Sequence, residues 1–372
     1  MQIIHAPRDA ILKPLQTVAG IIEKRHTQAI LANVLIRQQG EQVTFTGTDI
    51  DIQVRSLATI GSGNEKVATT VAARKLIDIL RAMPDRDVAI ELNGAKLNLK
   101  SGKSRYALQT LPADDFPTMV ADSAQGQGEL RADVTLSQKK LRQLLQMVHF
   151  AMAQQDIRFY LNGLLLVLSP SSLRSVATDG HRLAFFEDTE LHAAGDASII
   201  LPRKSVLELL RLLHDTDEPV HLEVLGQQIR LSFGDIEFIS KLLEGKFPDY
   251  QRVIPTGYQK VVELEREAFA QALSRASILT NEKFKGVRLG LEPGSLKIHS
   301  SNTEQEEASE EIDIDYGGPA LDIGFNVSYL LDVLGNLKVD RVSIAFGDAN
   351  SSALLSLPGQ DGFRYVLMPM RI

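Results

Sequence analysis

The sequence contains no cysteine, and this absence removes several kinds of chemistry at once. Disulfide bonds, thiolate metal sites and cysteine nucleophiles are excluded, and a cytoplasmic location is favoured. No apolar run approaches the roughly 18 residues that indicate a membrane span. The segment Met1–Ala10 lacks the basic region and apolar core of a secretion signal. We therefore expect a cytoplasmic protein that is not embedded in a membrane.

Catalytic motifs are also missing. The sequence has no GxxxxGK[ST] phosphate loop, no HExxH zinc motif and no GxSxG nucleophile elbow. Asp179 and His181 could share the work of a general base, but the sequence places no serine nucleophile or third carboxylate beside them. An acidic run could bind a hard cation through oxygen ligands, although a solvated or ion-paired strand edge explains it better. The run consists of Glu304, Glu306, Glu307, Glu310 and Glu311. We expect no enzymatic activity, no metal and no cofactor.

One amphipathic helix occurs three times along the 372 residues. Its copies align on three acidic residues, Asp78, Glu208 and Asp332, which are separated by 130 and then 124 residues. Apolar residues at matching positions flank each of them, with the spacing of one buried helix face. A helix that recurs at about a third of the chain length indicates internal repetition.

The rest of the chain follows the same period, as helix, strands, helix, strands. The predicted helices are 8–25, 73–83, 137–155, 202–213, 266–279 and 326–337. Alternating apolar segments with turn dipeptides between them predict antiparallel hairpins. Ser123–Glu129, rich in Gly and Gln, is predicted to be a linker. We predict an α+β protein of three repeated domains, 1–126, 127–254 and 255–372, each with two helices packed on antiparallel sheets.

Charge is divided unevenly between the helices and the rest of the chain. The net charge is −7, but the first four predicted helices carry +2, +2, +3 and +2. The fifth helix, counted with Glu265 just before it, carries 0 and the sixth carries −1, which leaves −15 in the rest of the chain. Charged positions on a single helix are usually solvated, whereas basic residues at repeated positions fit a surface that meets a polyanionic backbone without reading bases. The last repeat has Ser328 and Gly335 in place of Lys204 and Arg211, so this surface is uneven.

Recognisable motifs lie in order along the whole chain, in the segments Leu12–Gly20, Thr46–Asp49, Ala73–Lys75, Thr110–Pro117, Phe159–Gly163, Val176–Ala184, Pro202–Lys204, Phe247–Val253, Asn281–Leu289, Glu304–Ala308, Gly324–Leu334 and Val366–Arg371. With these segments, the chain resembles the bacterial sliding clamps, the β subunits of DNA polymerase III. No single segment is specific, but together they are.

The resemblance implies a ring-shaped, head-to-tail homodimer whose helices line the hole. Such a ring encircles duplex DNA without sequence preference and tethers replicative and repair polymerases as a processivity factor. The implied partners are double-stranded DNA, the catalytic subunit of DNA polymerase III, the clamp loader, and other polymerases or repair proteins that bind through short apolar motifs.

The resemblance also assigns residues. The partner-peptide cleft, between the second and third domains, maps to Leu161, Thr178, Gly180, His181, Arg182, Leu183, Pro248, Arg252, Val253, Asn326, Tyr329, Val366, Met368, Pro369, Met370 and Arg371. The dimer interface maps to Lys103, Arg105, Tyr106 and Leu108 against Ile278, Leu279, Glu304 and Glu306. Family-type DNA contacts map to Arg25, Gln155 and Lys204. To these the helix charge pattern adds Arg74, Lys75, Arg81, Lys139, Lys140, Arg142 and Arg211.

Two other classes of protein remain as alternatives. An enzyme would need Asp179 or His181 for turnover, whereas a clamp would need them only for binding partners. A structural scaffold that never meets DNA would be indifferent to reversal of its basic helix residues.

Overall fold

The computed structural model describes residues 1–23, 28–62, 66–119 and 129–371, and it contains the predicted helices. They are α1 (Arg8–Ala19), α2 (Ala73–Ala82), α3 (Gln138–Gln146), α4 (Arg203–Leu212), α5 (Arg266–Ser277) and α6 (Val327–Asn336). Their apolar stripes are buried: Leu76 and Leu80 of α2 are fully covered, as is Val206 of α4. No described helix is long and apolar enough to cross a membrane.

Strands fill the spaces between the helices in the same order in each repeat. The first repeat contains β1 (Gln2–Pro7), β2 (Asn33–Gln39), β3 (Gln42–Thr48), β4 (Ile52–Thr59), β5 (Lys66–Ala72), β6 (Asp87–Asn93), β7 (Lys96–Ser101) and β8 (Ser104–Leu111). The middle repeat contains β9 (Leu130–Ser137), β10 (Gly163–Leu168), β11 (Leu173–Thr178), β12 (Arg182–Asp188), β13 (Ala194–Gly195), β14 (Ala197–Pro202), β15 (Pro219–Leu225), β16 (Gln228–Phe233) and β17 (Ile236–Lys241). The last repeat contains β18 (Lys260–Glu265), β19 (Gly286–Glu292), β20 (Ser295–Ser301), β21 (Glu307–Asp313), β22 (Leu321–Asn326), β23 (Arg341–Phe346), β24 (Ala353–Leu357) and β25 (Gln360–Leu367).

The α+β class and the antiparallel sheets are confirmed. The strands form sheets of 13, 8 and 4 members, and the registered strand pairs run antiparallel. Antiparallel pairing follows from the short hairpin turns, which place consecutive strands beside one another.

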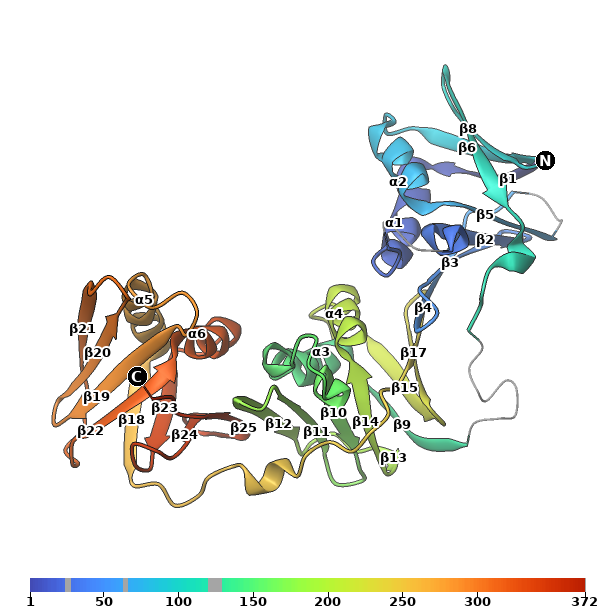
Figure 1. Cartoon of the computed structure of the whole chain (residues 1–372). Coiled ribbons are helices and arrows are strands. Elements are labelled where there is room, and N and C mark those ends of the chain that lie inside the picture. The colour runs from blue at the N-terminus through green and yellow to red at the C-terminus, as the bar shows by residue number, and fades with distance from the viewer. Residues whose placement is uncertain (24–27, 63–65, 120–128, 372) are drawn as a thin grey trace. The chain divides into compact units, whose positions relative to one another are not determined.

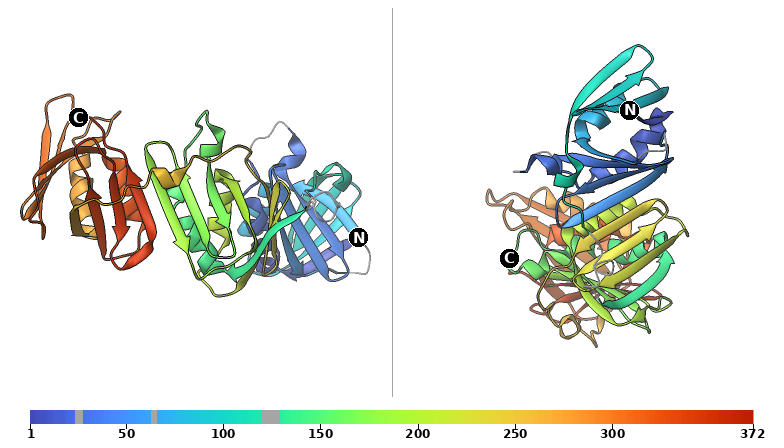
Figure 2. Two further views of the ribbon diagram at one scale, coloured as in Figure 1. Left: turned by 90° about the horizontal axis from the view of Figure 1, so that it is seen from below. Right: turned by 90° about the vertical axis from the view of Figure 1, so that its right-hand side faces the viewer.

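By its contacts, the chain divides into two compact units. Unit 1 comprises 1–141, 193–197 and 211–242, and unit 2 comprises 142–192, 198–210 and 243–372. Within unit 1, α1 and α2 lie side by side (Figure 1), and α1 also packs on β3 and β4. Within unit 2, α5 and α6 pack on each other, with α5 against β20 and β21; Figure 2 shows these elements from two further sides.

The division into units passes through the middle repeat because each of its sheets continues into a neighbour. β17 pairs with β4 inside unit 1, from Ile236 opposite Ser56 to Ser240 opposite Ile52. β12 pairs with β25 inside unit 2, from Arg182 opposite Leu367 to Phe186 opposite Phe363. The three-domain division at 126 and 254 stays a prediction, and its first boundary, with most of the predicted linker, falls outside the described residues.

Two features differ from the expectation. A strand (β1, β9, β18) precedes the first helix of every repeat, where none was predicted. The first helix of the middle repeat was expected to reach residue 155, but α3 ends at Gln146 and a 3₁₀ turn follows at His149–Ala151. The His149 ring bonds the Gln146 carbonyl through Nδ1 at 3.0 Å. It thereby occupies an acceptor that a continuing helix would use.

Candidate partner-binding site

The turn between β11 and β12 is built by its own side chains. Thr178 Oγ1 donates to the Arg182 carbonyl at 2.6 Å and accepts from the Gly180 amide at 3.1 Å. Asp179 Oδ1 accepts the amides of His181 and Arg182 at 2.9 and 3.1 Å. Gly180 has φ +90°, which favours glycine. The carboxylate of Asp179 therefore serves the backbone of this turn, and Oδ2 is left for the Arg182 guanidinium.

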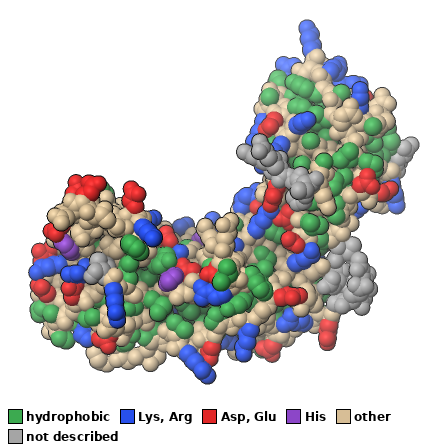
Figure 3. Space-filling model, in the orientation of Figure 1, with side chains coloured by type: hydrophobic (Ala, Val, Ile, Leu, Met, Phe, Trp, Pro, Cys, Tyr) green, Lys and Arg blue, Asp and Glu red, His purple; other side chains and the backbone are tan. Residues whose placement is uncertain are grey.

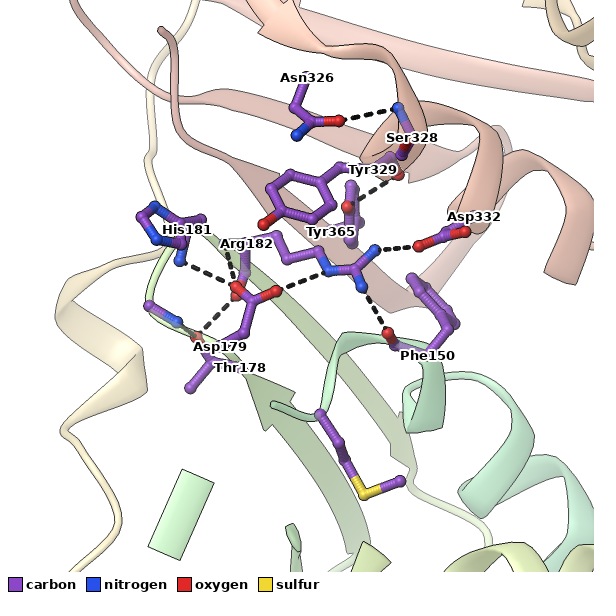
Figure 4. A network of polar contacts seen from close by, with 12 residues as sticks. Phe150, Thr178, Asp179, His181, Arg182, Asn326, Ser328, Tyr329, Asp332 and Tyr365 are labelled. Carbon is purple, nitrogen blue, oxygen red and sulfur yellow. Dashed lines mark hydrogen bonds and ion pairs between the residues drawn. The ribbon is translucent and has the colours of Figure 1, made fainter. Parts of the chain in front are cut away.

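Arg182 is the centre of the polar network in Figure 4, and it is only 8% exposed. Nε donates to Asp179 Oδ2 at 3.1 Å, Nη1 to Asp332 Oδ2 at 2.7 Å and Nη2 to the Phe150 carbonyl at 2.7 Å. The guanidinium carbon also lies 4.3 Å from the centre of the Tyr329 ring. A buried cation needs such complete pairing, because an unpaired one would lose its hydration without compensation. Arg182 thereby joins β12 of the middle repeat to α6 of the last.

A cavity of about 550 Å³ lies beside this network, within unit 2. It is lined by His149, Phe150, Met152, Ala153, Gln154, Asp156, Asp179, His181, Arg182, Arg203, Leu207, Tyr329 and Asp332. Burial, and then the charge of Arg182, lower the pKa of Arg203, while burial lowers the pKa of His149. Arg158 holds the pKa of the Asp156 carboxyl down to about 2. The cavity has no arrangement of a nucleophile with a base, since Asp179 is committed to the turn and to Arg182.

An apolar wall stands on the other side of the Asp179–Arg182 turn. Leu183 and Val366 face each other in the register of β12 and β25, and both belong to a buried cluster with Phe185, Ile200 and Phe247. The chain beyond β25 is anchored at two points, by Met368 N to the His181 carbonyl at 3.0 Å and by Met370 N to the Gly324 carbonyl at 2.9 Å.

All sixteen residues assigned to the peptide cleft lie in unit 2, and the network and the apolar wall bring a subset of them together. That subset comprises Thr178, Gly180, His181, Arg182, Leu183, Tyr329, Val366 and Met368. Leu161 is buried, whereas Val253 and Met368 are about half exposed (46% and 51%), as apolar side chains at a binding surface would be. Pro248 lines a second cavity in unit 2, of about 460 Å³, with Leu165, Ile200 and Phe247, and Arg252 pairs with Asp249 at 2.9 Å.

Sequence reasoning missed Phe150, Asp332, Tyr365 and Arg203 as members of this site. Asp332 had been noticed only as a marker of the repeat. Its partner Arg182 lies 150 residues away, and no local spacing could connect the two. The Tyr365 hydroxyl donates to the Tyr329 carbonyl of α6 at 3.0 Å across 36 residues, which is also beyond the reach of local spacing.

The residues predicted to contact DNA are distributed over α2, α3, α4 and the loop before Phe159. Arg25 lies outside the described residues. Arg74, Lys75, Lys139, Gln155 and Lys204 are exposed, whereas Lys140 and Arg142 are half-buried. Arg211 donates to the Thr17 carbonyl at 2.5 Å, and Arg81 lies 3.2 Å from the side-chain amide of Gln16. The last two guanidiniums thus meet the end of α1. On the face seen in Figure 3, acidic and basic side chains are interspersed.

The residues predicted for the dimer interface are at the surface of their units. Tyr106 on β8 is 39% exposed, and Ile278 just after α5 is 77% exposed. Arg105 bonds the carbonyls of Gly102 and Ser104, and Glu306 accepts from Asn302 Nδ2 at 2.6 Å.

The acidic run is engaged by neighbouring side chains. Glu310 accepts Arg275 Nε and Nη2 at 2.9 and 2.6 Å, and that hydrogen bond lowers the pKa of the Glu310 carboxyl. Glu311 accepts Ser295 Oγ. The described residues contain no group of three or more His, Asp or Glu arranged to hold a metal ion. The ion-paired strand edge is therefore the reading that the contacts favour.

Comparison with known proteins identifies relatives along the full length. Three family profiles match, described as the N-terminal, central and C-terminal domains of the DNA polymerase III beta subunit, over residues 1–120, 135–249 and 251–371. The beta sliding clamps of Pseudomonas putida and Escherichia coli are 49% and 42% identical to this chain. Each alignment covers 98% of this chain and 98% of the relative. Solved structures agree: a Pseudomonas aeruginosa DNA polymerase sliding clamp with ligand superposes with a TM-score of 0.94 at 45% identity, covering 100% of both chains. A clamp of the same organism bound to griselimycin gives 0.93 at 46% identity, also over 100% of both chains.

Proposed function

This chain belongs to the DNA polymerase III beta subunit family of bacterial sliding clamps, and from that membership we propose how its surfaces serve the clamp. It is a DNA sliding clamp, a non-catalytic subunit that makes a polymerase processive. The observation that carries this conclusion is the match to all three domains of the family, at up to 49% identity over 98% of the chain. The place of action that we propose is the cytoplasm.

The proposed contact with duplex DNA is made by exposed basic side chains of the helices. Arg74 and Lys75 open α2, Lys139 opens α3 and Lys204 opens α4, and all four are exposed. Lysine and arginine on a helix surface bind phosphates by charge and carry no base specificity, which is what a sliding protein requires. Gln155, Lys140, Arg142 and Arg211 are further members of the proposed surface, and Arg81, also predicted to contact DNA, lies with Arg211 at the end of α1.

The proposed dimer joins two chains head to tail through sheet edges. β21 is the edge strand of its sheet, and β8 pairs with β5 only at Thr110 and Leu111. Within the chain, β17 pairs with β4 and β12 pairs with β25. By position in the repeat, β21 corresponds to β4 and β12, while β8 corresponds to β17 and β25. Pairing β21 with β8 of a second copy would repeat those two junctions, with the acidic β21 beside Lys103 and Arg105.

The proposed partner site is the apolar wall of Leu183 and Val366, bounded by the Asp179–Arg182 turn and the anchored segment at Met368. Short motifs with apolar anchors would bury their side chains there and bond to the exposed turn. The DNA polymerase III catalytic subunit and the clamp loader are the partners that we propose for it.

A retention experiment tests the clamp function. The protein is loaded on a nicked circular plasmid with its loader, and the plasmid is then cut once. We expect the protein to leave only after the cut, because a closed ring is held by topology and slides off a free end. Protein that stays on linear DNA, or that never associates with the circle when another clamp does, would contradict the tether.

A further inference from the structure

Both junctions between successive repeats are closed by the same kind of polar contact. In unit 1, Arg211 near the end of α4 donates to α1 at the Thr17 carbonyl (2.5 Å), with Nη1 3.5 Å from the Gln16 carbonyl. In unit 2, Asn336 at the end of α6 donates through Nδ2 to the Gln146 carbonyl of α3 at 2.7 Å. The last carbonyls of a helix lack partners inside the helix, and they attract donors and cations. Each junction thus uses the last turn of one repeat's second helix to cap the first helix of the repeat before it.

The matching positions of these contacts follow from the helix starts. The first helices begin at Arg8, Gln138 and Arg266, so the carbonyls of Gln16, Gln146 and Ser274 are equivalent. The second helices begin at Ala73, Arg203 and Val327. Arg81 therefore stands in α2 where Arg211 stands in α4, and Gly335, the matching residue of α6, is followed by Asn336.

The end of α5 has the same features as the ends of α1 and α3, but no helix of a following repeat packs on it within the described chain. The Gln146 carbonyl accepts a local side chain, His149, together with Asn336 from the next repeat. The Ser274 carbonyl accepts the equivalent local side chain, Ser277 Oγ, at 2.7 Å. Phe150, twelve residues after the start of α3, packs on Tyr365 of β25 with ring centres 5.7 Å apart. Its counterpart after α5 is Ile278, which is 77% exposed. The end of α5 thus presents the Ser274 carbonyl as an acceptor and Ile278 as an exposed apolar residue. The matching donor position is Arg81, at the end of α2 in a second copy of the chain.

We propose that Arg81 of one copy caps the C-terminal carbonyls of α5, at Ser274, in a second copy of this chain. Arg81 is exposed at the end of α2, so its guanidinium can turn from the Gln16 side chain to this acceptor. Arg81 is then an interface residue and not a DNA contact, and the subunit boundary is a third junction of the same design. The inference rests on the proposed head-to-tail dimer.

The absence of native cysteine allows a direct test. Arg81→Cys is combined with Ser277→Cys in one chain, and oxidation with copper phenanthroline is followed on denaturing gels. We expect covalent dimers. The matched positive control is His149→Cys with Asn336→Cys, which should cross-link within one chain because both native side chains bond the same carbonyl. The negative control is Arg74→Cys with Ser277→Cys, since Arg74 lies at the other end of α2.

A second variant avoids any doubt about cysteine geometry. Because a ring-shaped dimer has two such boundaries, Arg81→Gln should weaken the dimer about a hundredfold in sedimentation equilibrium, about tenfold for the charged hydrogen bond lost at each boundary. Arg74→Gln, with the same loss of charge, should leave the dissociation constant unchanged. Suppose that the unmodified chain dimerises, that Arg81→Gln dimerises equally well, and that the cysteine pair forms no cross-link. These results together would overturn this inference and leave the proposed dimer intact. An unmodified chain that remains monomeric would overturn the proposed dimer itself.

Discussion

Arg182 shows how much organisation one side chain can impose. Its donors reach two carboxylates and one carbonyl, which come from the turn after β11, from α6 and from the segment after α3. Burial alone would lower its pKa, but the neighbouring Tyr365, Asp332 and Asp179 more than offset that effect and leave the pKa raised. An arginine guanidinium stays protonated in proteins, so Arg182 carries its charge within the network. The orientation of the guanidinium depends on its acceptors. Of the two carboxylates, that of Asp332 is more exposed than that of Asp179.

At this scale we predict the effect of Asp332→Asn. The amide keeps an acceptor but loses the charge, so Arg182 should be less firmly held. Because Asp332 is about half exposed, at 47%, the free energy of unfolding should fall by only about 1 kcal/mol. The affinity for a fluorescent peptide with apolar anchors should fall severalfold, measured by polarisation.

Asp322→Asn is the matched control for that change. Asp322 lies in the same repeat and meets Arg288 at 3.7 Å, but it is 61% exposed and has no part in the network. Equal peptide affinity in both variants would mean that Asp332 does not position Arg182 for binding.

Helix ends, more than helix middles, decide how the elements join. α1 has no basic residue in its last turn, and the cation at its end comes from α4 as Arg211. α6 has a side-chain cap at its start, where the Asn326 side chain accepts the Ser328 amide at 2.9 Å. The contacts of Arg211 with α1 and of Asn336 with α3 link elements that are distant in sequence, so each junction has a polar side chain beside its paired strands.

We expect Arg211→Ala to destabilise unit 1 by about 1 kcal/mol, since it removes a charged hydrogen bond that is partly open to water. Urea unfolding followed by circular dichroism would measure the change. Lys139→Ala, an exposed helix position with no such carbonyl contact, should shift the transition midpoint by much less. If Arg211→Ala lowers the free energy of unfolding no more than Lys139→Ala does, Arg211 does not stabilise the end of α1.

At the scale of elements, the sequence was informative wherever periodicity was strong. Val206 and Leu209 of α4, and their equivalents in the other repeats, mark helices that the structure contains, because an amphipathic stripe depends only on local spacing. β1, β9 and β18 were missed because each runs directly into a helix whose own pattern dominates the window. α3 was predicted too long because Val148 and Met152 continue its apolar spacing after the His149 ring has taken the Gln146 carbonyl. The sequence named Arg182 and Tyr329 as expected members of the cleft, but it could not supply the connections of the network, which join segments up to 150 residues apart.

For the whole molecule, the distribution of charge separates two ways of staying on DNA. A protein held by six to ten phosphate contacts loses roughly 10³- to 10⁵-fold in affinity between 50 and 200 mM salt. A closed ring is held by its own continuity, so its retention on an uncut circle should change by less than about tenfold over that range. Gel filtration of loaded plasmid at the two salt concentrations gives the comparison.

Lys204→Glu, introduced together with Lys139→Glu, supplies the control for that measurement. Once loaded, this variant should stay on the circle as long as the unmodified protein, while its loading slows. A steep loss of retention with salt in the unmodified protein would instead indicate simple charge-mediated binding.

The pairing of β12 with β25 has a consequence for how the chain matures on the ribosome. β12 begins at Arg182, but its partner β25 begins only at Gln360. β4 likewise waits for β17, which begins at Ile236. Each earlier sheet therefore leaves the ribosome with an open edge, and the middle repeat keeps one until residues 360–367 have been synthesised. An open edge can pair with the strands of other chains and so aggregate. We therefore expect the nascent chain to need protection of that edge, for example by chaperones, until its partner strand arrives.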